Sequence, residues 1–321
     1  MKPVIAITMG DPVGVGPEIV LKALADERVG SVCTPVVVGD EGLLRHLAQR
    51  LGLRPPGEGA VVNASRLKLA GLRAGAPTRA TSRAMIAYIE KAVAMVQAGE
   101  ARALATGPIS KEAARKAGFA FPGHTEFLAH LTGTKDFRMM LGGADLLVIL
   151  TTIHVPLKKV PRLVTTERVL KTIEITNTSF KRYFGLERPR IAVAGLNPHA
   201  GEAGLFGDED DRVIAPAVKA AQRRGVLATG PLPPDTVFYR AAVKKEFDCV
   251  VCMYHDQGLG PLKLLHFEDG INATLGLPII RTSVDHGTAY DIAWTGKAGH
   301  ESMVNAITTA ADMARRKDRY A

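Results

Sequence analysis

The sequence predicts an α/β protein in which strands and helices alternate from end to end. Short apolar runs of strand length recur along the 321 residues, and segments with helical spacing of apolar residues separate them. Hydrophobic residues make up 46% of the chain and charged residues 23%, which is ordinary for a globular protein. A chain of this length suits two compact domains or one large one.

In the N-terminal part, the run PVIAIT predicts a strand, and the turn GDPVGVG leads to a helix that begins near Pro17. TPVVVGD and ARALATGP predict two further strands. Between these two, residues 82–98 have helical spacing and the pattern stops at Gly99. Ser110 is a plausible N-cap for a short helix that ends at Gly118.

In the second half, LLVILTT, RIAVAG and DCVVCM predict strands, and residues 166–183 and 211–225 predict the helices between them. Two short strands follow around INATLGLPIIRT, and ESMVNAITTAADMARRK predicts a last helix. No internal repeat and no polar linker marks a boundary. We expect residues 1–122 together with 282–321 to form one α/β domain and residues 123–281 to form a central one.

Charge and composition argue against several classes of partner. The formal net charge is +9, but the basic residues are scattered and no nucleic-acid motif occurs, so an anionic small substrate is the better explanation. The best apolar run, LLVIL, is far shorter than the ~20 residues of a membrane-spanning helix. The start MKPVIAITMGDP lacks a secretory pattern, which predicts a buried first strand and a cytoplasmic protein. Cys249 and Cys252 spell C-x-x-C inside a strand, where they face opposite ways, so we expect core residues.

Three histidines each follow an apolar, strand-like run. LLVILTTIH ends at His154, RIAVAGLNPH at His199 and DCVVCMYH at His255. Ligands of α/β proteins bind beyond the carboxyl ends of parallel strands, and neutral imidazole is a common ligand of zinc-like ions. Each histidine alone could be an ordinary polar loop residue, but three in the same topological position favour a metal site.

Other motifs predict sites for anions. The loop GDPVGVGPE could bind an anion through its amides or be a simple tight turn; it is not G-x-G-x-x-G, because Ile19 stands at the third glycine position. GHTEF places His124 and Thr125 at a helix start, where both can donate to a phosphate or carboxylate and Thr125 could be the N-cap. PPDTVF places Asp235 at another loop-to-helix junction, as an N-cap or a site residue.

The stretch after MYHDQG brings several reactive side chains together in the sequence. It contains Asp256, Lys263, Asn272 and Arg281. Arginine prefers bidentate contacts to phosphate or carboxylate, and a lysine whose pKa is lowered can exchange protons. This set predicts a binding site for an anionic substrate.

The loop VDHGTAYDIAWTGKA resembles the HGSAPDIAG loop of the metal-dependent β-decarboxylating dehydrogenases, such as isopropylmalate dehydrogenase. There the loop contacts the adenosine of the nicotinamide cofactor, and GDPVGVGPE is similar to the GDGIGPE start of those enzymes. The resemblance implies a cofactor-binding role for His286, Gly287, Thr288, Ala289 and Asp291.

Taken together, TMGDPVGVGPE, TGPISK, PGHTEF, TTIHVPL, GLNPHAGE, PPDT, MYHDQGL, PLK and INATLGLPIIRTSVDHGTA closely resemble the 4-hydroxythreonine-4-phosphate dehydrogenase family over residues 5–305. The resemblance implies two α/β/α domains related to isocitrate and isopropylmalate dehydrogenases, with a cleft between the domains and active sites shared in a homodimer. The first domain would be the cofactor side. By the same resemblance, the metal ligands are His154, His199 and His255, from both subunits, and the substrate-binding residues are His124, Thr125, Lys263, Asn272 and Arg281.

The implied activity is the oxidation and decarboxylation of 4-phosphooxy-L-threonine to 3-amino-2-oxopropyl phosphate, in the synthesis of pyridoxal 5'-phosphate (vitamin B6). It uses NAD or NADP and a divalent metal, Zn, Mg or Co, as a Lewis acid. Candidates for acid–base catalysis are Lys263, Asp256 and Asp235. A sister activity on 4-phosphothreonate or phosphoerythronate is the main alternative. A phosphate acyltransferase and a non-catalytic sensor fit less well, because they leave the histidines or the Lys-Asn-Arg set without a role.

Overall fold

The computed structural model describes residues 1–317 and divides the chain into two compact units. Among the described residues, unit 1 is Met1–Lys135 together with residues 277–317, and unit 2 is Asp136–Gly276. The sequence placed the boundaries at 122/123 and 281/282 instead. The difference arises because helix α6 (His124–Leu131) contacts α4 and strand β11 (Arg281–Val284) pairs with β4, so both belong with unit 1.

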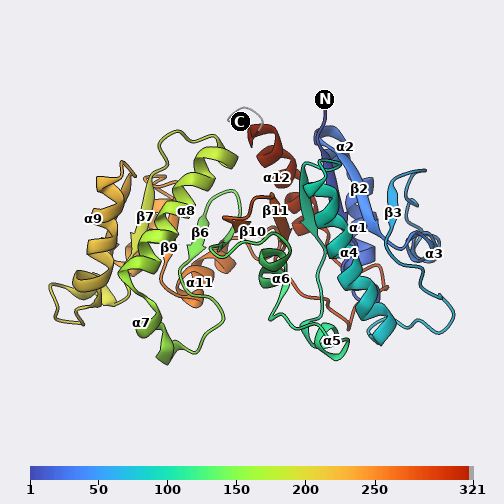
Figure 1. Cartoon of the computed structure of the whole chain (residues 1–321), viewed down its shortest axis with the longest axis horizontal. Helices are drawn as coiled ribbons and strands as arrows, with labels where there is room; N and C mark the ends of the chain where they lie inside the picture. The colour runs from blue at the N-terminus through green and yellow to red at the C-terminus, as the bar shows by residue number, and fades with distance from the viewer. Residues whose placement is uncertain (318–321) are drawn as a thin grey trace. The chain divides into compact units, whose positions relative to one another are not determined.

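Unit 1 is built on a parallel sheet in the order β3-β2-β1-β4-β11. Its other strands are β1 (Val4–Thr8), β2 (Thr34–Gly39), β3 (Val61–Asn63) and β4 (Ala103–Thr106). Its other helices are α1 (Gly16–Ala25), α2 (Glu27–Val32), α3 (Glu41–Leu51), α4 (Arg79–Gln97), α5 (Lys111–Lys116) and α12 (Glu301–Lys317). α4, teal in Figure 1, packs on β1, β2 and β4, whereas α12 packs on β11, β4 and β1 and also contacts α1 and α2.

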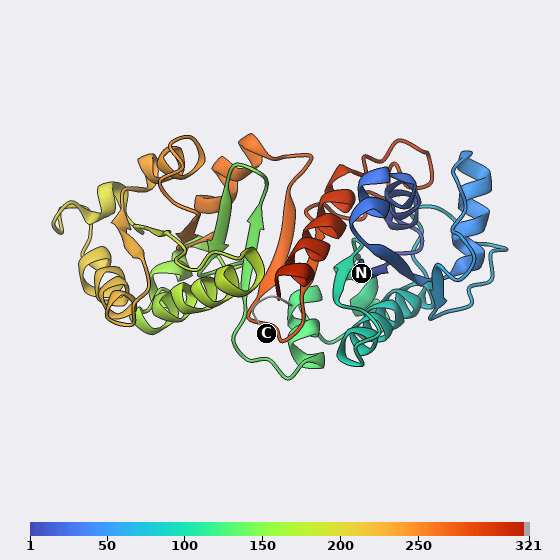
Figure 2. The same ribbon diagram turned by 90° about the horizontal axis from the view of Figure 1, so that it is seen from above.

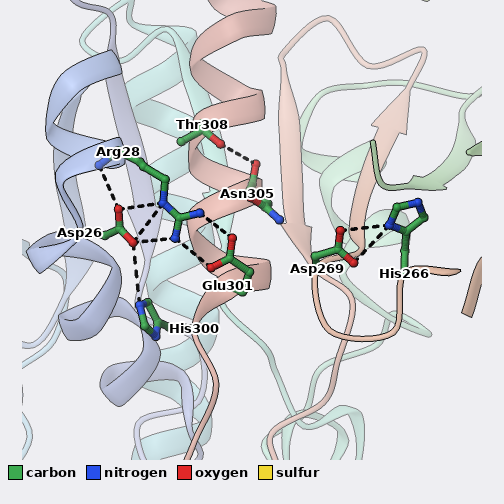
Figure 3. Close-up of polar contacts among 8 residues, drawn as sticks. All are labelled: Asp26, Arg28, His266, Asp269, His300, Glu301, Asn305 and Thr308. Atoms are coloured by element: carbon green, nitrogen blue, oxygen red, sulfur yellow. Dashed lines mark hydrogen bonds and ion pairs between the residues drawn. The ribbon is translucent and has the colours of Figure 1, made fainter. Parts of the chain in front are cut away.

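An ion-pair network joins the start of α2 to the start of α12 in unit 1 (Figure 3). Arg28 lies between Asp26 and Glu301, with nitrogen–oxygen distances of 2.7 and 2.6 Å. His300 Nε2 is 4.0 Å from Asp26. The side chains of Arg28 and Glu301 are well exposed, so their ion pair adds little to the stability of the fold. It connects the two helix ends.

Unit 2 has a mixed sheet in the order β10-β5-β6-β9-β7-β8. β5 (Arg138–Gly142) runs antiparallel to β10 (Ile271–Leu275) and β6 (Leu147–Leu150), whereas β6, β9 (Cys249–Cys252), β7 (Ile191–Ala194) and β8 (Ala228–Leu232) are mutually parallel. Its helical elements are η1 (Leu157–Lys159), α7 (Val160–Leu163), α8 (Thr166–Phe184), η2 (Pro198–Gly201), η3 (Asp210–Ile214), α9 (Ala215–Arg223), α10 (Pro234–Ala242) and α11 (His255–Leu265).

The sheet of unit 2 has a core on each face. One cluster joins α8 and α9 to the sheet and contains Cys249; the other joins α10 and α11 to it and contains Cys252. In Figure 2 the yellow-green α8 lies on one side of these strands and the orange helices lie on the other. Both thiols are buried and free, which confirms that C-x-x-C here contributes core residues on opposite faces.

The α/β class and the strands that precede the three histidines are confirmed, whereas several elements differ from the prediction. Ser110 is an N-cap, accepting from the amide of Ala113. Thr125 and Asp235 are not N-caps, because α6 is capped by Gly123 and α10 by Pro233, which leaves both side chains in a first helical turn. None of the helices within residues 1–317 is long and apolar enough to cross a membrane.

Helix α11 was not predicted at all. It contains Gly258, Gly260 and Pro261, residues with poor helix propensity, so its local sequence gives a weak helical signal. Leu262, fully buried against the sheet of unit 2, shows that tertiary packing stabilises the helix.

Candidate functional site

The three candidate metal ligands lie beyond the carboxyl ends of adjacent parallel strands of unit 2. His154 follows β6, His199 lies in η2 after β7, and His255 is the first residue of α11 after β9. β6, β9 and β7 are consecutive in the sheet, so the three residues belong to one edge.

His154 and His255 lie close together, with ring centroids 5.5 Å apart and an angle of 45° between the rings. Two imidazoles that bind one tetrahedral ion at about 2.0–2.1 Å would have centroids about 5 Å apart. Nδ1 of His255 is 2.7 Å from Asp256 Oδ1, which leaves Nε2 as the nitrogen available to a metal ion. A carboxylate on the second nitrogen is the usual partner of a metal-binding histidine. The pair therefore fits a divalent ion.

His199 is placed differently from this pair. Its side chain is 58% exposed, with Nδ1 3.9 Å from Asp235 Oδ2. Both residues line a cavity of about 340 Å³ that also includes Asn197, Tyr254 and Gln257. Among residues 1–317, no group of three or more His, Cys, Asp or Glu side chains is arranged to hold a metal ion. The described chain thus brings two of the three predicted ligands together and not the third.

Two residues predicted to bind substrate in unit 1, His124 and Arg281, interact with each other, and His124 also interacts with Lys111 at the N-terminus of α6. We call this group of residues, together with the N-terminus of α6, the cation pocket. Arg281 is 3% exposed, and its Nε and Nη2 donate to Thr106 Oγ1 at 3.2 and 2.9 Å. Burial lowers the pKa of Arg281 to about 10, partly offset by the carboxylate of Glu126, so the guanidinium stays charged at neutral pH.

His124 is neutral in this pocket. Burial of the ring, together with the positive charges of Arg281 and Lys111, holds the pKa of His124 well below its usual range. Its Nε2 is buried and has no hydrogen-bond partner among the described residues. An unsatisfied buried nitrogen requires an explanation, and a ligand oxygen at this point would supply one.

The N-terminus of α6 adds backbone donors to the cation pocket. Gly123 offers no side-chain acceptor to the first amides of the helix. A Cβ added at Gly123 would lie 3.2 Å from Lys111 Cε and 3.3 Å from Glu126 Oε2, so glycine permits the close approach of Lys111. Thr125 is 5% exposed in the first turn. Backbone amides, a helix dipole and cationic side chains are the groups from which proteins build anion-binding sites.

The two predicted substrate residues of unit 2 lie on different elements, β10 and α11. Oδ1 of Asn272, on β10, is buried and has no hydrogen-bond partner within the described part of the chain. Nζ of Lys263, in the last turn of α11, lies 5.3 Å from the centroid of the Phe267 ring. The other acid–base candidates are Asp256, whose side chain is 89% exposed beside His255, and Asp235 beside His199.

The predicted cofactor loop is joined to the N-terminal turn of unit 1. Val15 N donates to Thr288 O at 3.0 Å, Tyr290 Oη donates to Asp11 Oδ2 at 2.6 Å, and Trp294 Nε1 donates to Pro12 O at 3.2 Å. Burial raises the pKa of Asp11. Burial is also the larger of two causes that raise the pKa of Tyr290 to about 12, and the hydrogen bond to Asp11 is the second, so the phenol remains protonated.

The turn GDPVGVG is therefore not an anion site. The turn is buried, and the amides of Val13, Gly14 and Val15 donate to Asp11 Oδ1, Asp11 O and Thr288 O. Glu18, fully buried, accepts from the amides of Gly296 and Ala298. The N-terminal motif thus fixes residues 288–298. His286, Gly287 and Asp291 of the cofactor loop remain exposed, while Thr288 and Ala289 are partly buried.

Sequence reasoning missed several residues of these sites. Lys111 and Thr106 complete the cation pocket, and Tyr290 and Asp11 connect the cofactor loop to the N-terminal turn. The motif TGPISK contains the first two, but nothing in the sequence showed that it lies beside GHTEF.

Comparison with known proteins identifies the family. The family model described as pyridoxal phosphate biosynthetic protein PdxA matches residues 31–310. The chain belongs to this family.

Two different enzyme names occur among the relatives of this chain. The chain is 53% identical to a 4-hydroxythreonine-4-phosphate dehydrogenase of Desulfosudis oleivorans, over 98% of this chain and 96% of the relative. It is 44% identical to a D-threonate 4-phosphate dehydrogenase of Pectobacterium atrosepticum, over 98% of this chain and all of the relative. The crystal structure of the 4-hydroxythreonine-4-phosphate dehydrogenase from Klebsiella pneumoniae is similar at a TM-score of 0.86 and 44% identity, and the match covers 98% of this chain and 100% of that one.

Proposed function

We propose that this member of the family is a nicotinamide-dependent dehydrogenase that oxidises and decarboxylates 4-phosphooxy-L-threonine to 3-amino-2-oxopropyl phosphate. The observation that carries the proposal is the cation pocket, with its charged buried arginine and its unsatisfied His124 Nε2. It has the chemistry required to hold the phosphate of a small substrate. The names of the relatives specify which phosphorylated substrates to consider.

Arg281 and the amides at the start of α6 bind the phosphate in this proposal. The guanidinium is kept in place by its two hydrogen bonds to Thr106 and supplies charge-assisted hydrogen bonds. His124 accepts a proton more readily once a dianion neutralises the pocket, because a nearby negative charge favours the charged imidazole. Lys111 balances the remaining charge. A phosphate held in this way orients the reacting carbons, which are at the other end of the substrate.

His154, His199 and His255 would hold the divalent metal, Zn, Mg or Co. When bound, such an ion acts as a Lewis acid that acidifies a hydroxyl and stabilises negative charge on a neighbouring oxygen. His154 and His255 of one chain can approach the same ion, and Asp256 fixes the ring of His255 for this role. The third ligand, His199, would then come from the partner subunit of a homodimer.

Exposed apolar side chains of unit 2 support a homodimer with shared sites. Leu264 is 86% exposed, Phe267 75% and Val243 61%, and Tyr239 is also exposed. Tyr239 lies in α10 and Val243 directly follows this helix. Leu264 lies in α11 and Phe267 follows two residues after its end, so both are close in the chain to Lys263. Exposed apolar residues of this size on neighbouring elements are typical of protein–protein contacts.

The exposed part of the cofactor loop would bind NAD or NADP. His286, Gly287 and Asp291 present polar groups to solvent, and the contacts of Thr288 and Tyr290 keep the loop in one conformation. Of the acid–base candidates, Lys263 and Asp256 lie on α11 with His255, whereas Asp235 lies beside His199. We also propose a cytoplasmic location, in keeping with three free, buried cysteines.

The sister activity on D-threonate 4-phosphate is the second candidate, because relatives at 44% identity have that name. The test is the formation of reduced nicotinamide cofactor by the purified protein with each substrate, with and without a chelator. We expect turnover of 4-phosphooxy-L-threonine that the chelator abolishes. A strong preference for D-threonate 4-phosphate would assign the sister activity instead, and chelator-resistant turnover would contradict the metal site.

A further inference from the structure

A buried carboxylate holds the start of the turn that carries His199. Asp210 is fully buried; its Oδ1 accepts from the amide of Leu196 at 2.8 Å, and its Oδ2 accepts from that of Asn197 at 3.0 Å. A Cβ added at Gly195 would lie 2.7 Å from Asp210 Oδ1, so only glycine permits this approach. The carboxylate is thus fitted against the backbone two residues before His199.

Gln257 binds the carbonyl of the peptide group between Gly195 and Leu196, whose N–H donates to Asp210. Its Nε2 donates to Gly195 O at 2.6 Å, and its Oε1 accepts from Met253 N at 2.7 Å. Two buried side chains therefore hold three consecutive residues, 195–197. Because Gln257 follows His255 by two positions, this contact also ties the His199 turn to the end of β9 and the start of α11.

The turn that follows has an unfavourable backbone conformation. From His199 to Gly204 every residue has a positive φ, with values of 52°, 54°, 82°, 42°, 55° and 90°. The left-handed region is unfavourable for each of the four residues other than glycine, because their Cβ approaches the following carbonyl oxygen. Such a conformation persists only where surrounding contacts impose it. Asn197 Nδ2, which donates to Glu209 Oε2 at 2.8 Å, adds one such contact.

We propose that Asp210 is a positioning residue for His199: its carboxylate fixes the strained turn so that the imidazole is presented for metal binding. The inference rests on the proposed role of His199 as a metal ligand. Asp210 would not touch metal or substrate; it would act through the backbone of Leu196 and Asn197. A purely structural role would affect stability and leave metal affinity unchanged.

The test is the affinity of the full-length protein for Co²⁺, measured by titration of the apo form. Asp210→Asn keeps the side-chain volume but replaces one carboxylate oxygen with an NH₂ group. One of the two backbone amides then loses its acceptor and faces another donor. We expect Co²⁺ to bind about 10–100-fold more weakly, as for other outer contacts of metal ligands. Turnover should recover as Co²⁺ is raised to saturation. Asp211→Asn, at the exposed neighbour, is the matched control and should bind Co²⁺ as the wild type does.

The variant His199→Ala distinguishes a failure of the proposed metal site from a failure of the positioning role of Asp210. If it binds Co²⁺ as tightly as the wild type, the proposed metal site is wrong and this inference with it. If His199→Ala loses Co²⁺ while Asp210→Asn retains wild-type affinity, the inference alone is overturned. Should Asp210→Asn not fold, Asn197→Ala removes the side-chain contact to Glu209 and should weaken Co²⁺ binding by about 10-fold, the lower end of the range for outer contacts of metal ligands; wild-type affinity in that variant would then overturn the inference.

Discussion

The neutral state of His124 leads to a pH dependence that can be measured on the protein without substrate. The folded-state pKa of His124 lies well below its usual range near 6.5 because the ring is buried beside Arg281 and Lys111. Between these two pKa values the unfolded chain binds a proton at His124 and the folded chain does not. The free energy of unfolding therefore decreases as pH falls below about 6.5, by up to about 1.4 kcal/mol per pH unit from this residue.

His124→Gln removes this titration, so its stability should fall less steeply with acid than that of the wild type. The chain has a single tryptophan, Trp294, which is buried in unit 1, and its fluorescence reports the unfolding of the unit that contains His124. Urea unfolding at several pH values between about 7.5 and 5.5 gives the two slopes. The expected difference is about 1.4 kcal/mol per pH unit at the acid end.

A matched control is available on the same helix. His130 is exposed on α6, so replacing it does not touch a desolvated imidazole, and His130→Gln should leave the slope of the wild type unchanged. Inorganic phosphate should reduce the slope of the wild type, because an anion in the cation pocket stabilises the charged imidazole. Parallel pH profiles for the wild type and His124→Gln would refute the assignment of a neutral, desolvated imidazole.

Three further variants test other contacts. Asp256→Asn should weaken Co²⁺ binding about 10–100-fold, because His255 loses its charged partner, as a metal titration would show; wild-type affinity would contradict that role. Tyr290→Phe should raise the KM for the nicotinamide cofactor several-fold and leave Co²⁺ affinity unchanged, since the hydrogen bonds of the phenol to Asp11, Ser110 and Thr288 are lost; an unaltered KM would show that these contacts do not affect cofactor binding. Glu18→Gln should lower the stability of unit 1 by about 1–3 kcal/mol, measured by Trp294 fluorescence, and equal stability would show that its buried contacts contribute little.

The sequence predicted those parts of the site that depend on local pattern. Apolar runs that stop before His154, His199 and His255 placed all three at strand ends, because strand length and hydrophobicity are local signals. The glycine-rich start of the chain was ambiguous between an anion loop and a tight turn. The structure decides for the turn, since Thr288, far away in the sequence, provides the acceptor for its amide.

Features that depend on long-range packing were not predictable in this way. Helix α11 forms despite Pro261, because Leu262 is buried in the core of unit 2. The approach of His154 to His255, and the buried carboxylate of Asp210, arise from the order of the strands and not from residue spacing. Lys111 joins the cation pocket because glycine at 123 lets its side chain approach α6.

The most direct test of the central claim is a comparison of two substrates with two forms of the enzyme. The rate of nicotinamide reduction is measured with 4-phosphooxy-L-threonine and with 4-hydroxythreonine, for the wild type and for Arg281→Met. If the cation pocket holds the phosphate, the wild type should turn over the unphosphorylated compound very poorly even at saturation, because phosphate binding orients the reacting carbon. Arg281→Met should lose at least about 10-fold in kcat/KM for the phosphorylated substrate and little for the other. Equal turnover of both compounds by the wild type, or an equal loss on both in the variant, would contradict the account.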